Sequence, residues 1–466
     1  MSKYIINPTI QGDVTLGEGD RKNMMFVGRL AETGAVRNVH QDVSKEFVSI
    51  IIGQRGSGKS FSLGSQLESL CTTNRESSIG KRHEDRGVLL LDPNANFWTS
   101  AMPLRNGDHA RLKRQYSSLS GWRITVDDVA VQVWTPAGCR SSTDHPSVQE
   151  YFFDTSDFGC EEWAEILSLD TTQDPPGMLL SDLYYKLRVS GWHDGARRVD
   201  SVSRVDLRAL VNCLENDSDI NTGSAGYQRS TIAALKKELV SLSRRPLFAQ
   251  AGTPLTSLIR PGVFSIMMLP YELGRGLRSV LARVIISKMM SHRREATKLQ
   301  QRLDFEEMPE ALRRDLQSKV STLIPRTVLA IDEAQELIGD AGGDERAALE
   351  DYCLRGRGFG LSMILATQRP ESSSLSSKVT SQADTWYIHS LGSQGNISTV
   401  HDNLVTAFPE TVSDGRQTLD FYGLLRSLNT GQSLVAAKSM ETGNGVRRAF
   451  VMDTRPRVRI HGGDAA

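Results

Sequence analysis

A glycine-rich segment that ends in a lysine and a serine constrains this chain more than any other feature. The segment Gly53-Gln-Arg-Gly-Ser-Gly-Lys-Ser60 follows the apolar run 47–52 and precedes a helix-compatible stretch, 61–70. Glycines let backbone N–H groups turn toward a polyanion, and the N-terminus of a following helix adds the positive end of its dipole. The pattern in this context predicts the phosphate-binding loop (P-loop) of a nucleotide-hydrolysing protein.

The predicted loop assigns roles to its residues. Lys59 would reach the β- and γ-phosphates of a nucleoside triphosphate, and Ser60 would ligate Mg²⁺. ATP and Mg²⁺ are therefore the expected cofactors. The alternative interpretation is a glycine turn before a helix, without a ligand. The residues expected to contact the nucleotide are Gly53, Gln54, Arg55, Gly56, Ser57, Gly58, Lys59, Ser60 and Phe61.

Two adjacent carboxylates, Asp332 and Glu333, follow the apolar run 327–331. In P-loop proteins an acid at such a strand end supports Mg²⁺ through its water shell, which suits Asp332 as a metal ligand. Glu333 would point at the γ-phosphate and polarise the attacking water. The alternative interpretation is a strand that ends in a solvated acidic turn.

Short apolar runs alternate with helix-compatible stretches along the chain. Several runs are apolar throughout, as in parallel strands that helices cover on both faces. The sequence therefore predicts an α/β fold with a mostly parallel central sheet. The predicted strands are 47–52, 88–92, 131–134, 263–268, 327–332, 361–366, 385–389, 434–437 and 449–452.

The pattern of apolar residues changes from strand-like to helical over part of the chain. Leucines at helical spacing predict a helical insertion over 151–256, between two parts of one core. The core parts are 46–150, with the P-loop, and 257–466, with the acidic pair and the C-terminal tail. Residues 1–45 form a short N-terminal segment. The charge-dense stretch 291–319 predicts an exposed helix of mixed charge.

The charge balance limits how the chain could bind nucleic acid. Lys and Arg total 55, and so do Asp and Glu, which excludes a uniformly basic coat. Basic residues would have to gather locally, and Arg111, Lys113, Arg114 and Arg123 are candidates for contacts to DNA phosphates. The alternative interpretation is a solvated charged segment without DNA contact. The five cysteines form no Cys-x-x-Cys pair and no apolar run is long enough to cross a membrane, so a cytoplasmic location is expected.

The motifs, taken in order, resemble the HerA/FtsK superfamily of DNA-translocating ATPases, and its HerA branch most closely. The acidic pair is the start of the first motif, Asp-Glu-Ala-Gln-Glu-Leu at 332–337. The second motif is Gly-Arg-Gly-Phe-Gly-Leu at 356–361, and the third is Leu-Ala-Thr-Gln-Arg-Pro at 365–370. The tail 455–463, Arg-Pro-Arg-Val-Arg-Ile-His-Gly-Gly, also resembles the family. The resemblance implies a RecA-like core and a homo-oligomer, a hexameric ring with ATP sites between its subunits.

The resemblance also implies roles for three further residues. Gln368 would sense the γ-phosphate or position the attacking water. Arg357 would be an arginine finger that stabilises charge on the phosphoryl group of the neighbouring subunit's ATP, with Arg355 as the second choice. The alternatives are a polar strand end for Gln368 and a solvated surface position for either arginine.

The function expected from the resemblance is a Mg²⁺-dependent ATPase, of translocase or helicase type, that moves double-stranded DNA through a central channel. A partner nuclease or another effector protein is expected with it. HerA proteins usually carry an N-terminal β-barrel, and the 52 residues before Gly53 are too few for one in full. Two alternatives stay open: an ATP-switched scaffold ring of an antiviral defence complex, and a genome-packaging or conjugative DNA pump.

Overall fold

The computed structural model describes most of the chain and divides it into two compact units. Unit 1 comprises the described residues of 1–133, 255–270 and 285–466, and unit 2 comprises those of 134–254 and 271–284. The chain passes from one unit to the other within β8 (Val131–Pro136). The described residues are 12–32, 36–126, 128–142, 144–338, 344–371, 375–404, 411–413, 418–441 and 449–463.

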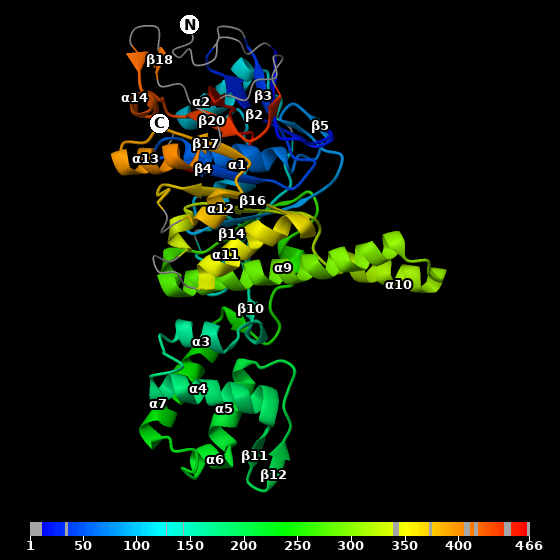
Figure 1. Ribbon diagram of the computed structural model, residues 1–466, viewed down its shortest axis with the longest axis vertical. Helices are drawn as coiled ribbons and strands as arrows, with labels where there is room; N and C mark the ends of the chain where they lie inside the picture. Colours follow the sequence, from blue (N-terminus) through cyan, green and yellow to red (C-terminus); the bar gives the residue numbers. More distant parts are fainter. Residues whose placement is uncertain are drawn as a thin grey trace. The chain divides into compact units, whose positions relative to one another are not determined.

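The centre of unit 1 is a parallel sheet (Figure 1). Its strands pair in register as parallel neighbours. They are buried along their whole length, so both faces of this part of the sheet are covered. The predicted α/β fold with a mostly parallel sheet is confirmed. The parallel strands, in spatial order, are β17 (Thr385–Ile388), β4 (Val48–Ile52), β16 (Leu361–Thr367), β15 (Thr327–Ile331), β7 (Gly87–Asp92) and β14 (Phe264–Met268).

The sheet continues beyond β17 through mostly antiparallel strands. β20 (Gln432–Ala437) pairs with β17, and β22 (Phe450–Thr454) pairs with β20. Three strands from the N-terminal segment follow: β2 (Met24–Leu30), β3 (Asn38–Asp42) and β1 (Val14–Leu16). The short strand β21 (Met440–Glu441) pairs with β1 at the edge. The segment 1–45 therefore contributes strands to the same sheet as the P-loop.

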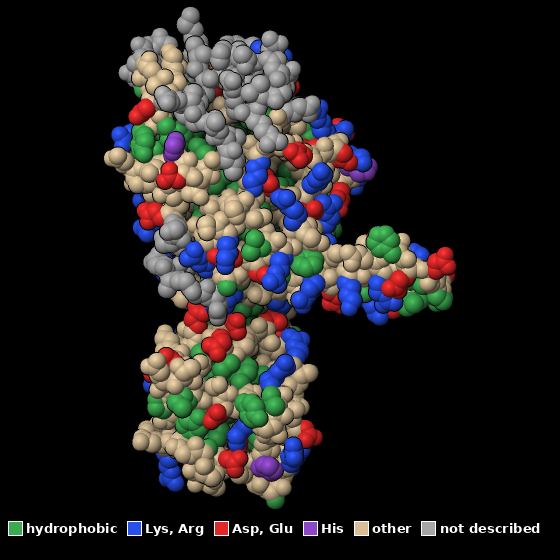
Figure 2. All heavy atoms as spheres, viewed as in Figure 1, with side chains coloured by type: hydrophobic (Ala, Val, Ile, Leu, Met, Phe, Trp, Pro, Cys, Tyr) green, Lys and Arg blue, Asp and Glu red, His purple; other side chains and the backbone are tan. Residues whose placement is uncertain are grey.

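Helices of unit 1 flank the sheet, and one pair projects from it. The exposed end of α9 (Arg275–Phe305) and all of α10 (Glu310–Ser321) carry Lys, Arg, Asp and Glu side chains side by side (Figure 2). Ion pairs one helical turn apart, such as Arg302 with Glu306, link them. The predicted exposure and mixed charge of 291–319 are confirmed, but the stretch forms two helices with a break at 306–309 and not one. The other helices of unit 1 are α1 (Lys59–Ser69), α2 (Ala110–Trp122), α8 (Leu255–Leu258), α11 (Asp344–Arg355), α12 (Ser377–Thr380), α13 (Gln394–Asn403) and α14 (Phe421–Ser427).

Unit 2 is mainly helical. Its core contains the leucines at helical spacing from which the helical insertion was predicted. Leu183, Leu210 and Leu239 are buried with others at helical intervals. Within the described residues of both units, no helix combines the length and the apolar character needed to span a bilayer. The predicted domain boundaries stay a prediction. The helices of unit 2 are α3 (Cys160–Ile166), α4 (Pro175–Tyr185), α5 (Leu207–Asn216), α6 (Ser218–Asn221) and α7 (Arg229–Ser243).

Candidate functional site

The predicted P-loop connects the end of β4 to the start of α1. Gly56 and Gly58 have φ angles of 78° and 100°, in the left-handed region that glycine enters without strain. A Cβ atom at Gly53 would lie 2.3 Å from the Ser57 Oγ. The glycines are therefore required by the path of the backbone. Gln54, Arg55 and Gly56 are exposed on the open side of the loop, whereas Lys59 is buried.

Adjacent parallel strands bring the predicted catalytic residues together. β16 pairs with β4, and β15 pairs with β16 on its other side, all in parallel, so the C-terminal ends of the three strands lie at the same edge of the sheet as the P-loop. The Lys59 Nζ donates to Asp332 Oδ1 at 2.9 Å and to Glu333 Oε1 at 2.8 Å. The Gln368 Nε2 also donates to Glu333 Oε1, at 2.7 Å. Residues from three separate parts of the sequence thus form one hydrogen-bonded cluster.

The backbone of Glu333 has an unusual conformation. Its φ of 48° and ψ of 54° place it in the left-handed region, which a residue with a side chain rarely adopts. Such strain persists where the surroundings fix it, and it is concentrated at functional sites. Here Gln335 donates to Glu333 Oε2 at 2.6 Å, and Thr367 donates to Gln335 Oε1 at 2.7 Å. Sequence reasoning missed Gln335, although it lies in the Asp-Glu-Ala-Gln segment.

Burial and charge act against each other in this cluster. Burial alone would lower the pKa of Lys59, but the carboxylates of Asp332 and Glu333 raise it above its ordinary value. Burial would likewise raise the pKa of Glu333, yet Lys59 and the hydrogen bonds to it lower that pKa. The pKa of Asp92, at the end of β7, is raised to about 7, mainly by burial and partly by the nearby Asp332, although the Phe97 N–H acts to lower it. The lysine and Glu333 therefore stay charged.

The two predicted metal ligands fit Mg²⁺. The Ser60 Oγ donates to Asp332 Oδ2 at 2.9 Å. Two neighbouring oxygen ligands of an octahedral ion bound at about 2.1 Å lie roughly 3 Å apart, so these oxygens can face one ion directly or through its water. Mg²⁺ keeps several waters and takes the rest of its ligands from phosphates, so two protein ligands suffice. Among the described residues, no group of three or more His, Cys, Asp or Glu side chains could hold a metal by itself.

The candidate arginines lie at the other end of the sheet from the P-loop of their own chain. Arg357 is in the turn before β16, and its Nη2 pairs with Asp384 Oδ2 at 2.8 Å. The same Asp384 oxygen accepts from the N–H of Val48, the first residue of β4. The P-loop begins after the last residue of that strand, about 13 Å further along. Arg355 pairs with Asp351 on the surface of α11. The structure therefore does not bring either arginine to its own nucleotide site.

A buried histidine beneath the P-loop was missed by sequence reasoning. His389 follows β17, which pairs with β4, and a Cβ atom at Gly53 would lie 2.7 Å from the His389 Cβ. Burial lowers the pKa of His389 to about 4. The imidazole is therefore neutral at physiological pH. Its position after the strand 385–388 was the only available signal, since it forms no motif with the P-loop in the sequence.

Protonation of His389 should make stability depend on pH. The pKa of 6.5 in the unfolded chain falls to about 4 on folding, so the unfolded state takes up the proton first as the pH falls. Stability is complete above pH 6.5 and declines between pH 6.5 and 4, by about 3 kcal/mol for this residue. Urea unfolding of His389→Gln should show a decline smaller by this amount, since other buried histidines such as His461 keep their own contribution. The matched control His401→Gln, at an exposed histidine, should follow the wild type, and a wild-type decline in His389→Gln would contradict the assignment.

The candidate DNA-binding residues divide into two groups. Arg111 is half-buried, and its guanidinium donates to the backbone carbonyls of His461 and Gly462, at 3.2 and 2.9 Å. Lys113 and Arg114, on α2, and Arg123, just after it, are exposed. Arg111 is therefore engaged within the chain, and only the exposed residues could bind a polyanion without rearrangement.

Comparison with known proteins reveals similarity at the level of the fold. No family model matches the chain, and no curated protein does. VirB4 of Thermoanaerobacter pseudethanolicus has a similar structure, with a TM-score of 0.52 and 14% identity over 95% of this chain and 98% of that chain. The bacterial conjugative coupling protein TrwB matches with a TM-score of 0.44 and 14% identity, over 90% of this chain and 86% of that chain.

A viral protein shares a more distant similarity. The genome-packaging NTPase B204 of Sulfolobus turreted icosahedral virus 2 matches with a TM-score of 0.30 and 10% identity, over 87% of this chain and 97% of that chain. At such identities the similarity concerns the fold alone, and the VirB4 match carries it. The chain therefore shares its overall α/β fold with VirB4.

Proposed function

We propose that this protein is a Mg²⁺-dependent ATPase that forms a ring and moves double-stranded DNA. The observation that carries the ATPase proposal is the cluster in which Lys59, Ser60, Asp332, Glu333 and Gln368 meet within hydrogen-bonding distance. A P-loop, a metal-supporting acid, a second acid and a polar sensor are the groups that phosphoryl transfer requires. A glycine turn without a ligand would not need the two carboxylates and the glutamine beside it.

The proposed catalytic roles follow from these contacts. Lys59 exchanges its two carboxylate partners for the β- and γ-phosphates when ATP binds. Glu333 is then free to orient and polarise a water molecule, and Gln368 stays beside it to sense the γ-phosphate. Ser60 and Asp332 would hold Mg²⁺, and the bound ion would neutralise charge on the phosphates.

A ring is proposed because the site is incomplete in one subunit. Charge on the transferring phosphoryl group needs a cation beyond Lys59, and arginine is the usual one. Arg357 is tethered through Asp384 to the start of β4, whereas the P-loop follows the end of β4. Arg357 can therefore serve only the site of a neighbouring subunit. The number of six subunits stays a prediction from the sequence.

The proposed substrate, double-stranded DNA, rests on two kinds of support. The order of the motifs at 332–337, 356–361 and 365–370 resembles that of the DNA-translocating HerA/FtsK superfamily. In this chain, Lys113 and Arg114 offer exposed positive charge on α2. A nuclease or effector partner, a role in defence and a cytoplasmic location stay predictions from the sequence.

Double-stranded DNA should stimulate ATP hydrolysis, and added salt should weaken the stimulation, because phosphate contacts release counterions. With several phosphate contacts, affinity should fall by roughly a thousandfold or more between 50 and 200 mM salt. The double reversal Lys113→Glu with Arg114→Glu should reduce stimulation and leave the basal rate unchanged. The matched control Arg314→Glu with Lys319→Glu reverses two exposed charges on α10. Equal stimulation of both double variants and the wild type would refute α2 as the DNA contact.

A further inference from the structure

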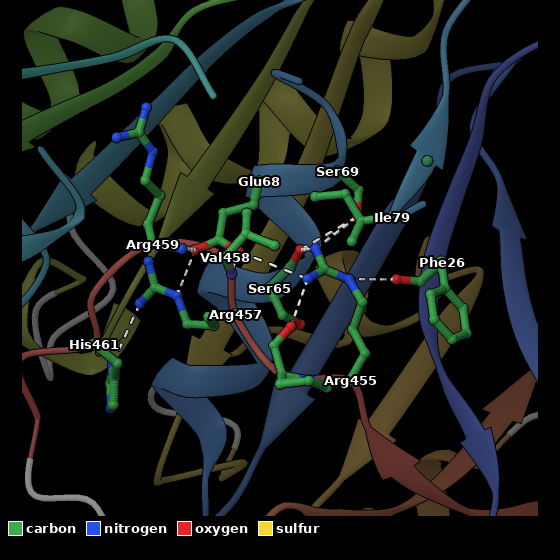
Figure 3. Close-up of polar contacts among 12 residues, drawn as sticks. Phe26, Ser65, Glu68, Ser69, Ile79, Arg455, Arg457, Val458, Arg459 and His461 are labelled. Atoms are coloured by element: carbon green, nitrogen blue, oxygen red, sulfur yellow. Dashed lines mark hydrogen bonds and ion pairs between the residues drawn. The ribbon is translucent and has the colours of Figure 1, made fainter. Parts of the chain in front are cut away.

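The last described segment of the chain lies along the P-loop helix (Figure 3). We name the residues Arg455–Gly463 the C-terminal strap. Its backbone is also held on the other side, where the Leu104 N–H donates to the Val458 carbonyl and the Ile460 N–H donates to the Met102 carbonyl. The strap is thus fixed between α1 and the segment before α2.

One buried carboxylate on α1 anchors the strap. Glu68 accepts from the Arg457 Nε at 2.8 Å, from the Val458 N–H at 2.9 Å and from the Arg459 N–H at 3.3 Å. Arg455 forms an ion pair with the same carboxylate at 3.7 Å. Both Glu68 and Arg455 are fully buried. A buried charge is tolerated when it is paired and hydrogen-bonded, so these contacts fix the register of the strap on the helix.

The close approach of the strap to α1 also requires a residue without a side chain in the helix. A Cβ atom at Gly64 would lie 2.5 Å from the Arg457 Cζ. Glycine inside a helix costs about 1 kcal/mol relative to alanine, and here it lets the guanidinium cross the helix closely. The Arg457 Nη2 reaches the Ser100 Oγ at 2.7 Å, and its Nη1 lies 3.3 Å from the His461 Nδ1. Arg457 therefore connects the anchor at Glu68 with the His461 ring.

This arrangement holds the His461 ring beside the nucleotide loop. The rings of His461 and Phe61 lie edge to face, with centroids 5.3 Å apart and an interplanar angle of 89°. Phe61 directly follows Ser60, the predicted Mg²⁺ ligand. Both rings are half-buried, so part of each is accessible. Burial, Arg457 and Arg111 lower the pKa of His461 to about 3, so its ring is uncharged at physiological pH.

We propose that His461 and Phe61 form the contact surface for the base of the bound nucleotide, with Glu68 and Arg457 as positioning residues. The proposal rests on the proposed ATPase function. The P-loop cradles the α- and β-phosphates, and its lysine reaches the β- and γ-phosphates. The base therefore leaves on the α-phosphate side, by the first turn of α1, where the Phe61 and His461 rings lie. Aromatic rings bind any base through its π-face, so this surface favours nucleotides over inorganic polyphosphate without selecting ATP over GTP.

The test compares ATP with inorganic tripolyphosphate, which carries the phosphates without a base. Calorimetric titration in the presence of Mg²⁺ should show roughly three- to tenfold weaker ATP binding by His461→Ala, the size expected for the loss of one aromatic contact. Tripolyphosphate should bind His461→Ala and the wild type equally. His461→Phe should restore ATP binding, since the ring suffices. The matched control His401→Ala removes a similar edge-to-face ring pair, with Phe421, away from the P-loop and should bind ATP normally.

The outcomes separate the two proposals. Wild-type affinity of His461→Ala for ATP would overturn the base contact and leave the ATPase proposal intact. An equal loss of ATP and tripolyphosphate affinity would also overturn it, because His461 would then act by shaping the phosphate loop. Failure of the wild type to bind ATP would overturn the proposed function, and the base contact with it.

Discussion

Replacement of Lys59 by alanine is expected to abolish ATP binding. The substitution removes the ammonium group that would neutralise the β- and γ-phosphates, and the backbone cradle alone does not replace it. It also leaves Asp332 and Glu333 without their shared cation in a buried site. Breaking a buried ion pair costs about 3–5 kcal/mol, so the melting temperature should fall as well. Nucleotide titration and thermal unfolding, measured together, check both expectations.

Two further variants show whether the effect belongs to the nucleotide site. Glu333→Gln should bind ATP and fail to hydrolyse it, because the carboxylate acts on water and not on the phosphates. Lys186→Ala is the matched control, since Lys186 also bridges two carboxylates, Asp217 and Asp219, outside the P-loop. It should bind ATP as the wild type does. ATP binding by Lys59→Ala at wild-type affinity would contradict the assignment.

Arg357→Ala is expected to lower ATP turnover by about a thousandfold or more while ATP binding is retained. The arginine contributes to the transition state and not to the ground state, so the loss should appear in kcat with little change in KM. Its ion pair with Asp384 is half-exposed, so the fold should tolerate the change. Steady-state kinetics and a melting curve of the same preparation measure both effects.

Arg355→Ala is the control for this prediction. Arg355 is more exposed than Arg357 and pairs with Asp351 one turn away on its own helix. It should hydrolyse ATP at the wild-type rate. Normal turnover by Arg357→Ala together with loss of turnover by Arg355→Ala would reverse the assignment of the arginine finger.

The parallel core could be predicted because its signals are local. Runs such as 327–331 and 361–367 are apolar at every position, which is typical of strands covered on both faces. The P-loop could be predicted because the backbone path itself requires glycines at fixed positions. Once parallel strands were expected, their C-terminal ends had to meet, which brought the acidic pair and Gln368 near Lys59.

The remaining features depend on contacts between distant parts of the sequence. β1, at Val14–Leu16, and β3, at Asn38–Asp42, are short or mixed in polarity, so they carry no strand signal of their own. The Glu68–Arg457 contact joins residues 389 positions apart, and neither residue belongs to a motif that predicts the other. Arg111 was expected at DNA, but a basic helix has the same composition whether its arginines meet solvent or a backbone carbonyl.

The most direct test of a site shared between subunits is a mixing experiment with two inactive proteins. Lys59→Ala subunits keep Arg357, and Arg357→Ala subunits keep Lys59, so some interfaces in a mixed ring contain both. ATP turnover should be about a thousandfold or more below the wild-type rate in each variant alone and should recover in part after mixing. Full turnover by a monomeric wild-type protein, measured on a size-separated fraction, would contradict the proposal that a neighbouring subunit completes the site.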